Sequence, residues 1–266
     1  MRGRVSVTME RVMELNNKIV LVVGGAAGIG KATAEVCAAR GATVIVADYN
    51  EEAGAAVAEG IRAQGQPAGA DRVCFIPVNA TDETSVARMY EQIGSRYGRL
   101  DALVQCAGVL KGAFVPVEEF PLDVFRNVVE VNMVGSFLCS KHAVPLMKQN
   151  GKGVIVLVSS GAAQGGSSSV AYGASKGGVS SMGITLAGKL APDNIRVNVV
   201  HPGEIRTAMK LSVIAAEAEL KGGSADEAVA QASAGSRLGE PEGMGRILAW
   251  LVSDDADYVR GFIHTR

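Results

Sequence analysis

The stretch Val22–Glu35, VVGGAAGIGKATAE, joins an apolar run to a segment of helical spacing through a glycine-rich turn. Glycines in such a turn permit positive φ angles and close approach of the backbone, and the free N–H groups of a helix start attract a pyrophosphate. Gly24, Gly28 and Gly30 are the residues expected to form this phosphate-binding turn. Three residues separate Gly24 from Gly28, so the spacing is not GxGxxG. Because the turn lies between a strand and a helix, it predicts a dinucleotide-binding unit.

Short apolar runs alternate with longer stretches of helical spacing along the rest of the chain. The expected strands are KIVLVV, TVIVA, RVCFIPV, LDALVQ, GVIVLVSS, IRVNVV and YVRGFIH. Helical patterns separate them, including long ones at about 120–149, 172–190 and 244–251. This alternation predicts the α/β class: a single-domain Rossmann fold, with a doubly wound parallel sheet of about seven strands and helices on both faces.

The chain of 266 residues is expected to form one domain over residues 15–266, preceded by a flexible N-terminal extension at 1–14. The segment 207–238 interrupts the strand and helix rhythm after the sixth strand. It is rich in Ala, Glu and Gly and follows a carboxyl strand end, where ligand-facing loops lie in open α/β sheets. We interpret it as a substrate flap, the alternative being a simple surface helix pair.

Composition narrows the classes of partner. Hydrophobic residues make up 48% of the chain and charged ones 20%, and the net charge of −1 comes without a basic stripe, so neither nucleic acid nor an anionic membrane is an expected partner. No run approaches the ~20 apolar residues of a membrane span, and a cytoplasmic protein is expected. The four cysteines match no metal pattern, so we expect reduced core thiols and no metal site.

Asp48 ends the second expected strand, 18 residues beyond Gly30. A carboxylate there accepts hydrogen bonds from a ribose 2′-OH and repels a 2′-phosphate, and the turn offers Ala26 and Ala27 rather than a basic residue. The position therefore favours NAD over NADP. The alternative is a solvated aspartate that starts the turn DYNEE.

Three further motifs follow in order. They are Asn132 in VVEVNMVGS, Ser160 in VLVSSG, and Tyr172 with Lys176 in YGASK. Together with the glycine turn they make the chain resemble the short-chain dehydrogenase/reductase family over about residues 15 to 264, nearly its whole length. The family's TGxxxGxG motif matches at its three glycines, with Val23 in place of the usual Thr.

The resemblance implies a catalytic set of Asn132, Ser160, Tyr172 and Lys176. We choose Ser160 over Ser159 because the tyrosine then follows the serine by twelve positions, a spacing often seen in the family. Tyr172 and Lys176, at i and i+4, share a helix face, and an ammonium beside a phenol favours the phenolate. The lysine, helped by the positive nicotinamide, is expected to bring the tyrosine pKa from about 10 to near 7.

The family pattern also assigns roles around this pair. Tyr172 is the acid–base, Ser160 binds the substrate oxygen, Lys176 also holds the nicotinamide ribose, and Asn132 positions a water. The implied cofactor-binding residues are Gly24, Gly28, Ile29, Gly30, Asp48, Asn79, Ala80, Ala107, Gly108, Tyr172, Lys176, Pro202, Gly203, Ile205 and Thr207.

Some positions depart from the family pattern or lie beside it. Gln105 and Cys106 replace two asparagines of the NNAG segment, and Asn79 replaces an aspartate. His201, before the PG loop, is expected to be a packed or hydrogen-bonded imidazole rather than a base. The expected substrate-pocket residues are Gln164, Gly165, Gly166 and Met209.

The resulting hypothesis is an oxidoreductase that transfers a hydride between NAD(H) and a secondary alcohol or ketone, with a small-molecule substrate. The alternatives are a 3-oxoacyl-thioester reductase on the same scaffold and a non-catalytic NAD-binding regulator. The resemblance further implies a homotetramer or homodimer, with contacts from the helices at 125–147 and 172–190.

Overall fold

The computed structural model describes residues 14–64 and 72–265, so the expected extension at 1–14 lies outside it except for Glu14. The described strands form one parallel sheet of seven, in the order β3-β2-β1-β4-β5-β6-β7. They are β1 Ile19–Val23, β2 Thr43–Asp48, β3 Val73–Pro77, β4 Ala102–Gln105, β5 Gly153–Val158, β6 Ile195–His201 and β7 Gly261–His264. The predicted fold class is confirmed.

The order in which strands are added to the sheet reverses at β1, because β2 and β3 lie on one side of it and β4 to β7 lie on the other. Val23, at the end of β1, pairs with Ala47 of β2 on one side and with Gln105 of β4 on the other. The carboxyl ends of the central strands are therefore level with one another. This is the topological switch point at which open α/β sheets bind their ligands.

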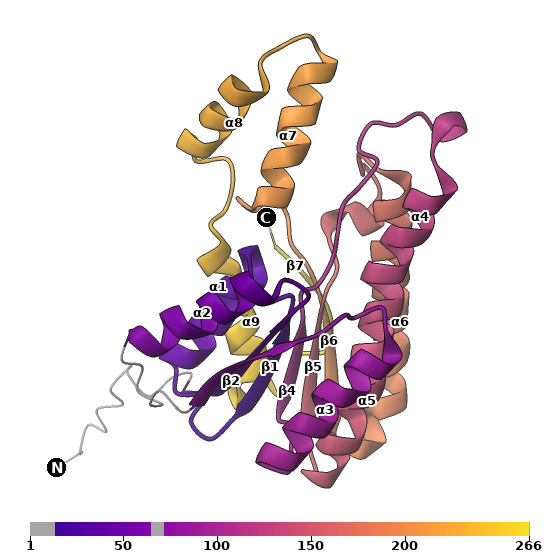
Figure 1. Cartoon of the computed structure of the whole chain (residues 1–266). Coiled ribbons are helices and arrows are strands. Elements are labelled where there is room, and N and C mark those ends of the chain that lie inside the picture. The colour runs from indigo at the N-terminus through magenta and orange to yellow at the C-terminus, as the bar shows by residue number, and fades with distance from the viewer. Residues whose placement is uncertain (1–13, 65–71, 266) are drawn as a thin grey trace, which may run out of the picture.

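Helices cover both faces of the sheet (Figure 1). One face carries α1 Gly28–Ala39, α2 Glu51–Ala63 and α9 Pro241–Val252, and the other carries α3 Glu83–Tyr97, α4 Leu122–Val129, α5 Gly135–Gln149 and α6 Val170–Leu190. A π-helical turn, Glu130–Val134, joins α4 to α5, so the expected helix at 120–149 is interrupted. Short 3₁₀ turns lie at Val117–Glu119, Gly161–Gln164, Ala191–Asp193 and Asp254–Ala256.

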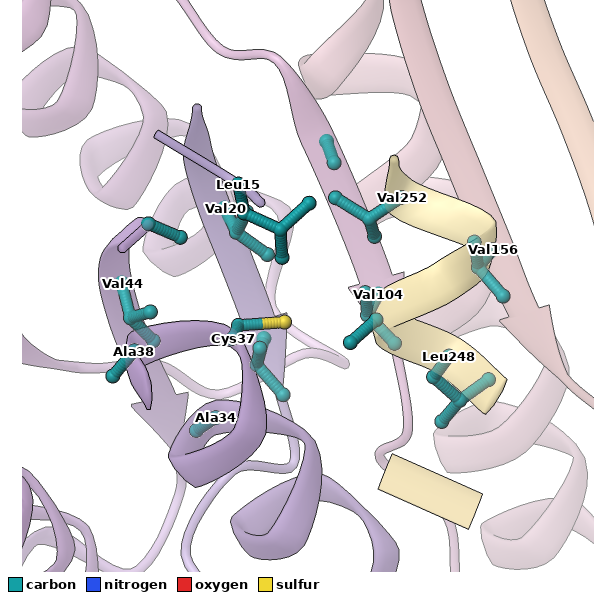
Figure 2. Packing of buried hydrophobic residues seen from close by; sticks show 14 of the residues in the cluster. Leu15, Val20, Ala34, Cys37, Ala38, Val44, Val104, Val156, Leu248 and Val252 are labelled. Atoms are coloured by element: carbon teal, nitrogen blue, oxygen red, sulfur yellow. The ribbon is translucent and has the colours of Figure 1, made fainter. Parts of the chain in front are cut away.

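Alternate strand residues pack into two apolar layers. Val20 and Val104 face α1 and α9, where Cys37, Leu248 and Val252 meet them (Figure 2). The intervening strand residues face α3, α5 and α6. Each such side chain contributes about 1.5–3 kcal/mol to folding stability when it is buried. This packing holds the strands in place, and with them the edge of the sheet that carries the site.

All four cysteines are free thiols. Burial raises the pKa of the Cys37, Cys106 and Cys139 thiols to about 12, so these three are protonated and poor nucleophiles at neutral pH. Among the described residues there is no group of three or more His, Cys, Asp or Glu side chains placed to hold a metal ion. Within the same residues, no helix has the length and apolar character needed to cross a membrane.

The predicted flap consists of α7 Ala208–Leu220 and α8 Ala225–Ala234. The two helices stand beyond the carboxyl edge of the sheet (Figure 1), and neither contains a buried residue. The two ends of the segment are joined, because the Arg206 N–H donates to the Gly239 carbonyl at 2.8 Å and the Gly239 N–H donates to the Glu204 carbonyl at 2.8 Å. The flap is thus an insertion whose first and last residues lie side by side.

Candidate active site

A cavity of about 1400 Å³ opens at the carboxyl edge of the sheet, between the glycine turn, the start of α6 and the flap. The sequence-predicted site residues that line it are Gly24, Gly28, Ile29, Gly30, Asp48, Asn79, Ala80, Ala107, Gly108, Ser160, Tyr172, Lys176, Pro202, Gly203, Ile205 and Thr207. Of the predicted catalytic and cofactor-binding residues, only Asn132 is not part of the lining. The fold therefore brings segments from the whole chain to one place.

The glycine turn, here called the glycine cradle, is packed too tightly to accommodate side chains at Gly24 and Gly30. Gly24 has a φ of +79°, and a Cβ on it would lie 2.4 Å from the backbone nitrogen of Ala107. A Cβ on Gly30 would lie 2.0 Å from the Gly24 carbonyl oxygen. Ala27, which precedes α1, offers no side-chain cap to the first helical N–H groups. These donors are suited to an anionic group such as a pyrophosphate.

Asp48 holds this turn and faces the cavity. Its Oδ2 accepts a hydrogen bond from the Ala26 N–H at 3.0 Å, and its Oδ1 accepts one from the Asn50 N–H at 3.0 Å. The carboxylate therefore starts a turn, as one interpretation expected, and it also lines the cavity, while its contact with a ribose stays a prediction. A carboxylate oxygen accepts more than one hydrogen bond, so capacity remains for a diol.

Ser169 fixes the start of α6 and with it the position of Tyr172. The Ser169 Oγ accepts from the Tyr172 N–H at 3.3 Å and donates to the Lys111 carbonyl at 2.7 Å. Ser160 hydrogen-bonds the Tyr172 side chain, whereas the Ser159 Oγ donates to the backbone carbonyl of Lys176 at 2.8 Å. The geometry thus pairs Ser160, rather than Ser159, with the tyrosine.

Lys176 alone does not lower the Tyr172 pKa in the polypeptide, and the expected value near 7, which included the nicotinamide charge, stays a prediction. Burial raises the pKa of Tyr172 above its ordinary value, and the hydrogen bond from Ser160 only partly opposes this. The Lys176 ammonium lies 5.8 Å from the centre of the Tyr172 ring and donates instead to the Val158 carbonyl at 2.8 Å. Burial also lowers the pKa of Lys176 to about 8. Desolvation outweighs the charge effect that the spacing predicts.

Asn132 lies buried on the π-helical turn, behind Gly108. Its Oδ1 accepts from the Val109 N–H at 2.7 Å, and its Nδ2 donates to the Val109 carbonyl and to the Ser175 Oγ, each at 2.9 Å. A Cβ on Gly108 would lie 3.2 Å from both the Asn132 Oδ1 and the Lys176 Nζ. Asn132 therefore clamps the segment after β4 onto α6 and lies near Lys176.

The positions that depart from the family pattern differ in their surroundings. The Asn79 Oδ1 accepts from the N–H and the hydroxyl of Thr81, at 3.1 and 2.8 Å, which leaves its Nδ2 for a ligand. Cys106 lines the cavity. Gln105 is 1% exposed, and its amide has no hydrogen-bond partner among the described residues.

Three of the four expected substrate-pocket residues line the cavity. They are Gly165, Gly166 and Met209, whereas Gln164 does not line it. The Gln164 Nε2 lies 3.3 Å from the His264 Nε2, because the 3₁₀ turn after β5 directs it toward β7.

His201 stacks on His264 with ring centres 4.5 Å apart, and its Nε2 lies 2.8 Å from the Ser180 Oγ. It is a packed imidazole, as expected.

Sequence reasoning missed two residues, Phe114 and Arg206. Phe114 lines the cavity. Arg206 hydrogen-bonds the Ser233 carbonyl and, at 3.1 Å, that of Gly235, and its guanidinium lies 2.9 Å from the Glu240 carboxylate. These contacts hold the end of α8 against the segment that precedes the flap. The signal available was a cation inside HPGEIRT, immediately before the flap.

Comparison with known proteins gives matches over most of the chain. The family model for short chain dehydrogenases matches residues 18–218. A trans-4-hydroxycyclohexanecarboxylate dehydrogenase of Sinomonas cyclohexanicum is 36% identical over 95% of this chain and 93% of its own. A 3-oxoacyl-acyl-carrier-protein reductase of Thermotoga maritima is 36% identical over 94% of this chain and 96% of its own.

A solved structure agrees. Levodione reductase superposes with a TM-score of 0.84 at 28% identity, covering 94% of this chain and 96% of its own. The predicted resemblance is thereby confirmed, as is the prediction of an oxidoreductase that acts on CH–OH groups. With its parallel sheet, its glycine cradle and its ordered motifs, the chain belongs to the short-chain dehydrogenase/reductase family.

Proposed function

We propose that this protein is an NAD-dependent dehydrogenase that transfers a hydride between NAD(H) and a secondary alcohol or its ketone. The observation that carries the proposal is the juxtaposition of Tyr172, Ser160 and Lys176 in the cavity whose other end is the glycine cradle. The similarity to a dehydrogenase of a hydroxylated cyclohexane ring supports the substrate class.

The residues around the cradle fit a dinucleotide. Gly24 and Gly30 let the turn pack tightly, because a Cβ at either position would collide with backbone atoms, and the N–H groups at the start of α1 suit the pyrophosphate. Asp48 suits an adenosine ribose with free hydroxyls and disfavours a 2′-phosphate, which supports NAD. The Asn79 Nδ2 is available for adenine, and Thr207 borders the opposite end.

Tyr172 and Ser160 act on the substrate oxygen in this proposal. Ser160 donates a hydrogen bond to that oxygen and stabilises its developing negative charge. Tyr172 takes the hydroxyl proton during oxidation and returns it during reduction. A bound nicotinamide supplies the acceptor for the hydride that leaves the same carbon.

Lys176 supplies positive charge beside the tyrosine. Its Nζ is held by the Val158 carbonyl, which places it between Tyr172 and the segment that contains Gly108. From there it suits a hydrogen bond to the nicotinamide ribose and favours the phenolate of Tyr172. Asn132 keeps Gly108 and Val109 against α6, so that this wall of the cavity stays in place.

The test is the variant Tyr172→Phe, with Tyr258→Phe as a matched control because Tyr258 is fully exposed. We expect Tyr172→Phe to lose turnover of secondary alcohols, measured as NADH absorbance, while NAD⁺ binding by calorimetry stays within about twofold of the unmodified chain. Tyr258→Phe keeps both. Near-normal turnover in Tyr172→Phe would remove the assignment.

The thioester-reductase alternative has its own support in the relative from Thermotoga maritima. Asp48 argues against it, because a preference for NADPH would suit that reaction better. A comparison of acetoacetyl thioester reduction with NADPH and alcohol oxidation with NAD⁺ separates the two. Cofactor binding with no turnover of either kind would favour the non-catalytic regulator.

We also propose a homotetramer in the cytoplasm. Phe137 on α5 and Ile184 on α6 are 47% and 43% exposed, and Phe262 on β7 is 46% exposed. Apolar residues at two separate places suit two kinds of subunit contact. The four free thiols suit a reducing compartment. A monomer mass in size-exclusion chromatography with light scattering would contradict the assembly.

A further inference from the structure

Phe114 has a left-handed backbone, with a φ of +63°. The other described residues outside glycine with positive φ are Asn17 and Asn194, and asparagine tolerates this region whereas a bulky aromatic residue does not. Phe114 lies between β4 and α4 and lines the cavity. Strained conformations of this kind persist where the surrounding structure imposes them, and they cluster at functional sites.

Two hydrogen bonds impose this conformation. The Phe114 N–H donates to the Ser168 carbonyl at 2.7 Å, and the Ser169 hydroxyl donates to the Lys111 carbonyl at 2.7 Å. Ser169 also accepts from the N–H of Tyr172. The loop that carries Phe114 is therefore hydrogen-bonded directly to the helix start that carries the tyrosine. These bonds fix the backbone of Phe114 relative to Tyr172.

Apolar side chains of α7 and of the loop after β4 form part of the lining. Met209 and Val213, one helical turn apart, both line the cavity, as does Leu110 on the loop that leads to Phe114. An aromatic ring together with aliphatic side chains provides a surface for a hydrocarbon skeleton.

The charges of the lining disfavour an anionic substrate. Besides Asp48 and Lys176, the charged residues among the described lining are Lys111, Glu130, Glu204, Lys210 and Glu217. Carboxylates outnumber ammonium groups in this set by one, and ion pairs join Lys210 to Glu204 and Glu217 to Lys221, so the lining offers an anionic substrate little net attraction. The same part of the lining contains no arginine, the residue best suited to hold a carboxylate.

We propose that Phe114 determines the specificity of this site, and that the substrate is an uncharged secondary alcohol whose hydrocarbon ring lies against Phe114. The proposal rests on the proposed function and deepens it. The strained backbone of Phe114 is retained because it directs the ring into the cavity at a fixed place relative to Tyr172. A substrate with little hydrocarbon beyond the carbinol carbon gains little from this contact.

The experiment compares steady-state oxidation of cyclohexanol, 2-propanol and trans-4-hydroxycyclohexanecarboxylate with NAD⁺. Phe114→Asn and Phe114→Gly both suit a left-handed backbone and remove the ring. The matched control is Phe120→Leu, because Phe120 lies in the same loop, packs edge-on against Phe125 and does not line the cavity. Melting temperatures and the KM for NAD⁺ show whether each variant keeps its fold and cofactor site.

In both Phe114 variants we expect the KM for cyclohexanol to rise about tenfold from lost apolar contact, with the KM for 2-propanol and for NAD⁺ changing by less than about twofold. Phe120→Leu keeps the original values. In the unmodified chain, kcat/KM for cyclohexanol exceeds that for the carboxylate by about tenfold or more.

An equal rise for both uncharged alcohols, or none for cyclohexanol, would overturn the role of Phe114. A preference for the carboxylate would overturn the uncharged substrate class. Failure of the proposed function looks different, because the unmodified chain would then bind NAD⁺ and oxidise no alcohol, and that result would overturn both proposals.

Discussion

Replacement of Asn132 by alanine tests whether this residue is a clamp. Its side chain makes three hydrogen bonds, two with the backbone of Val109 and one with the Ser175 Oγ, and it is fully buried. At about 1 kcal/mol for each bond, Asn132→Ala loses roughly 3 kcal/mol of unfolding free energy. For a protein of this size that corresponds to about 6–12 °C in melting temperature.

The same change loosens a wall of the cavity. Gly108, next to Val109, packs against both Asn132 and Lys176, so the cofactor site loses a fixed surface. We therefore expect the KM for NAD⁺ to rise by about tenfold together with the fall in melting temperature. Circular dichroism measures the melting, and steady-state kinetics measures the KM.

Two further variants sharpen the test. Asn132→Asp keeps the acceptor for the Val109 N–H but loses both donors and places a carboxylate opposite the Val109 carbonyl, so its loss of stability at neutral pH is at least that of the alanine variant. Gln149→Ala, at the exposed end of α5, melts within about 1 °C of the unmodified chain. If Asn132→Ala lowers kcat and leaves the melting temperature unchanged, the clamp argument is refuted and water binding becomes its main role.

The remaining predictions concern the cradle, the ribose and the lysine. Gly30→Ala abolishes NADH binding in a fluorescence titration, because its Cβ would lie 2.0 Å from the Gly24 carbonyl oxygen; Gly60→Ala, whose Cβ meets nothing within 4 Å, binds normally, and retained binding in Gly30→Ala would contradict the cradle. Asp48→Ser raises the KM for NAD⁺ about tenfold and lowers that for NADP⁺, and an unchanged ratio of the two would exclude Asp48 from the ribose site. Lys176 has a folded pKa of about 8 against an ordinary 10.5, so this side chain binds more protons in the unfolded chain between these values and its own contribution to the unfolding free energy rises with pH. The buried thiols, whose pKa values are raised, contribute a fall over the same range, so urea denaturation at about pH 8 to 10 should give a more negative slope in Lys176→Met than in the unmodified chain, and equal slopes would contradict this.

The strands were predictable because the sheet is covered on both faces. Residues such as Val20, Leu21 and Val22 are all fully buried, and an unbroken apolar run is the signature that this burial leaves in a sequence. The glycine turn was predictable for a related reason, since Gly24 and Gly30 each have backbone atoms where a Cβ would lie. These features are local in sequence, and local reasoning finds them.

The π-helical turn and the backbone of Phe114 were not predictable in this way. Apolar spacing continues through 120–149, so nothing local signals the wider turn at Glu130–Val134 that carries Asn132. Phenylalanine has no preference for a left-handed backbone, and the bond that holds Phe114 there comes from Ser168, 54 residues later in the chain. Both features depend on partners that only the fold brings close.

The pKa of Tyr172 shows a further limit of reasoning from spacing. The i and i+4 positions of Tyr172 and Lys176 correctly place both on one helix face, and from this a lowered tyrosine pKa follows only if the lysine charge is the largest effect. Burial raises the pKa of Tyr172 and lowers that of Lys176, and the Val158 carbonyl draws the ammonium to itself. Burial is set by segments distant in sequence, so the sign of the shift depends on the whole site. In the proposed reaction, the positive nicotinamide of NAD⁺ would add to the charge of Lys176 and favour the phenolate of Tyr172.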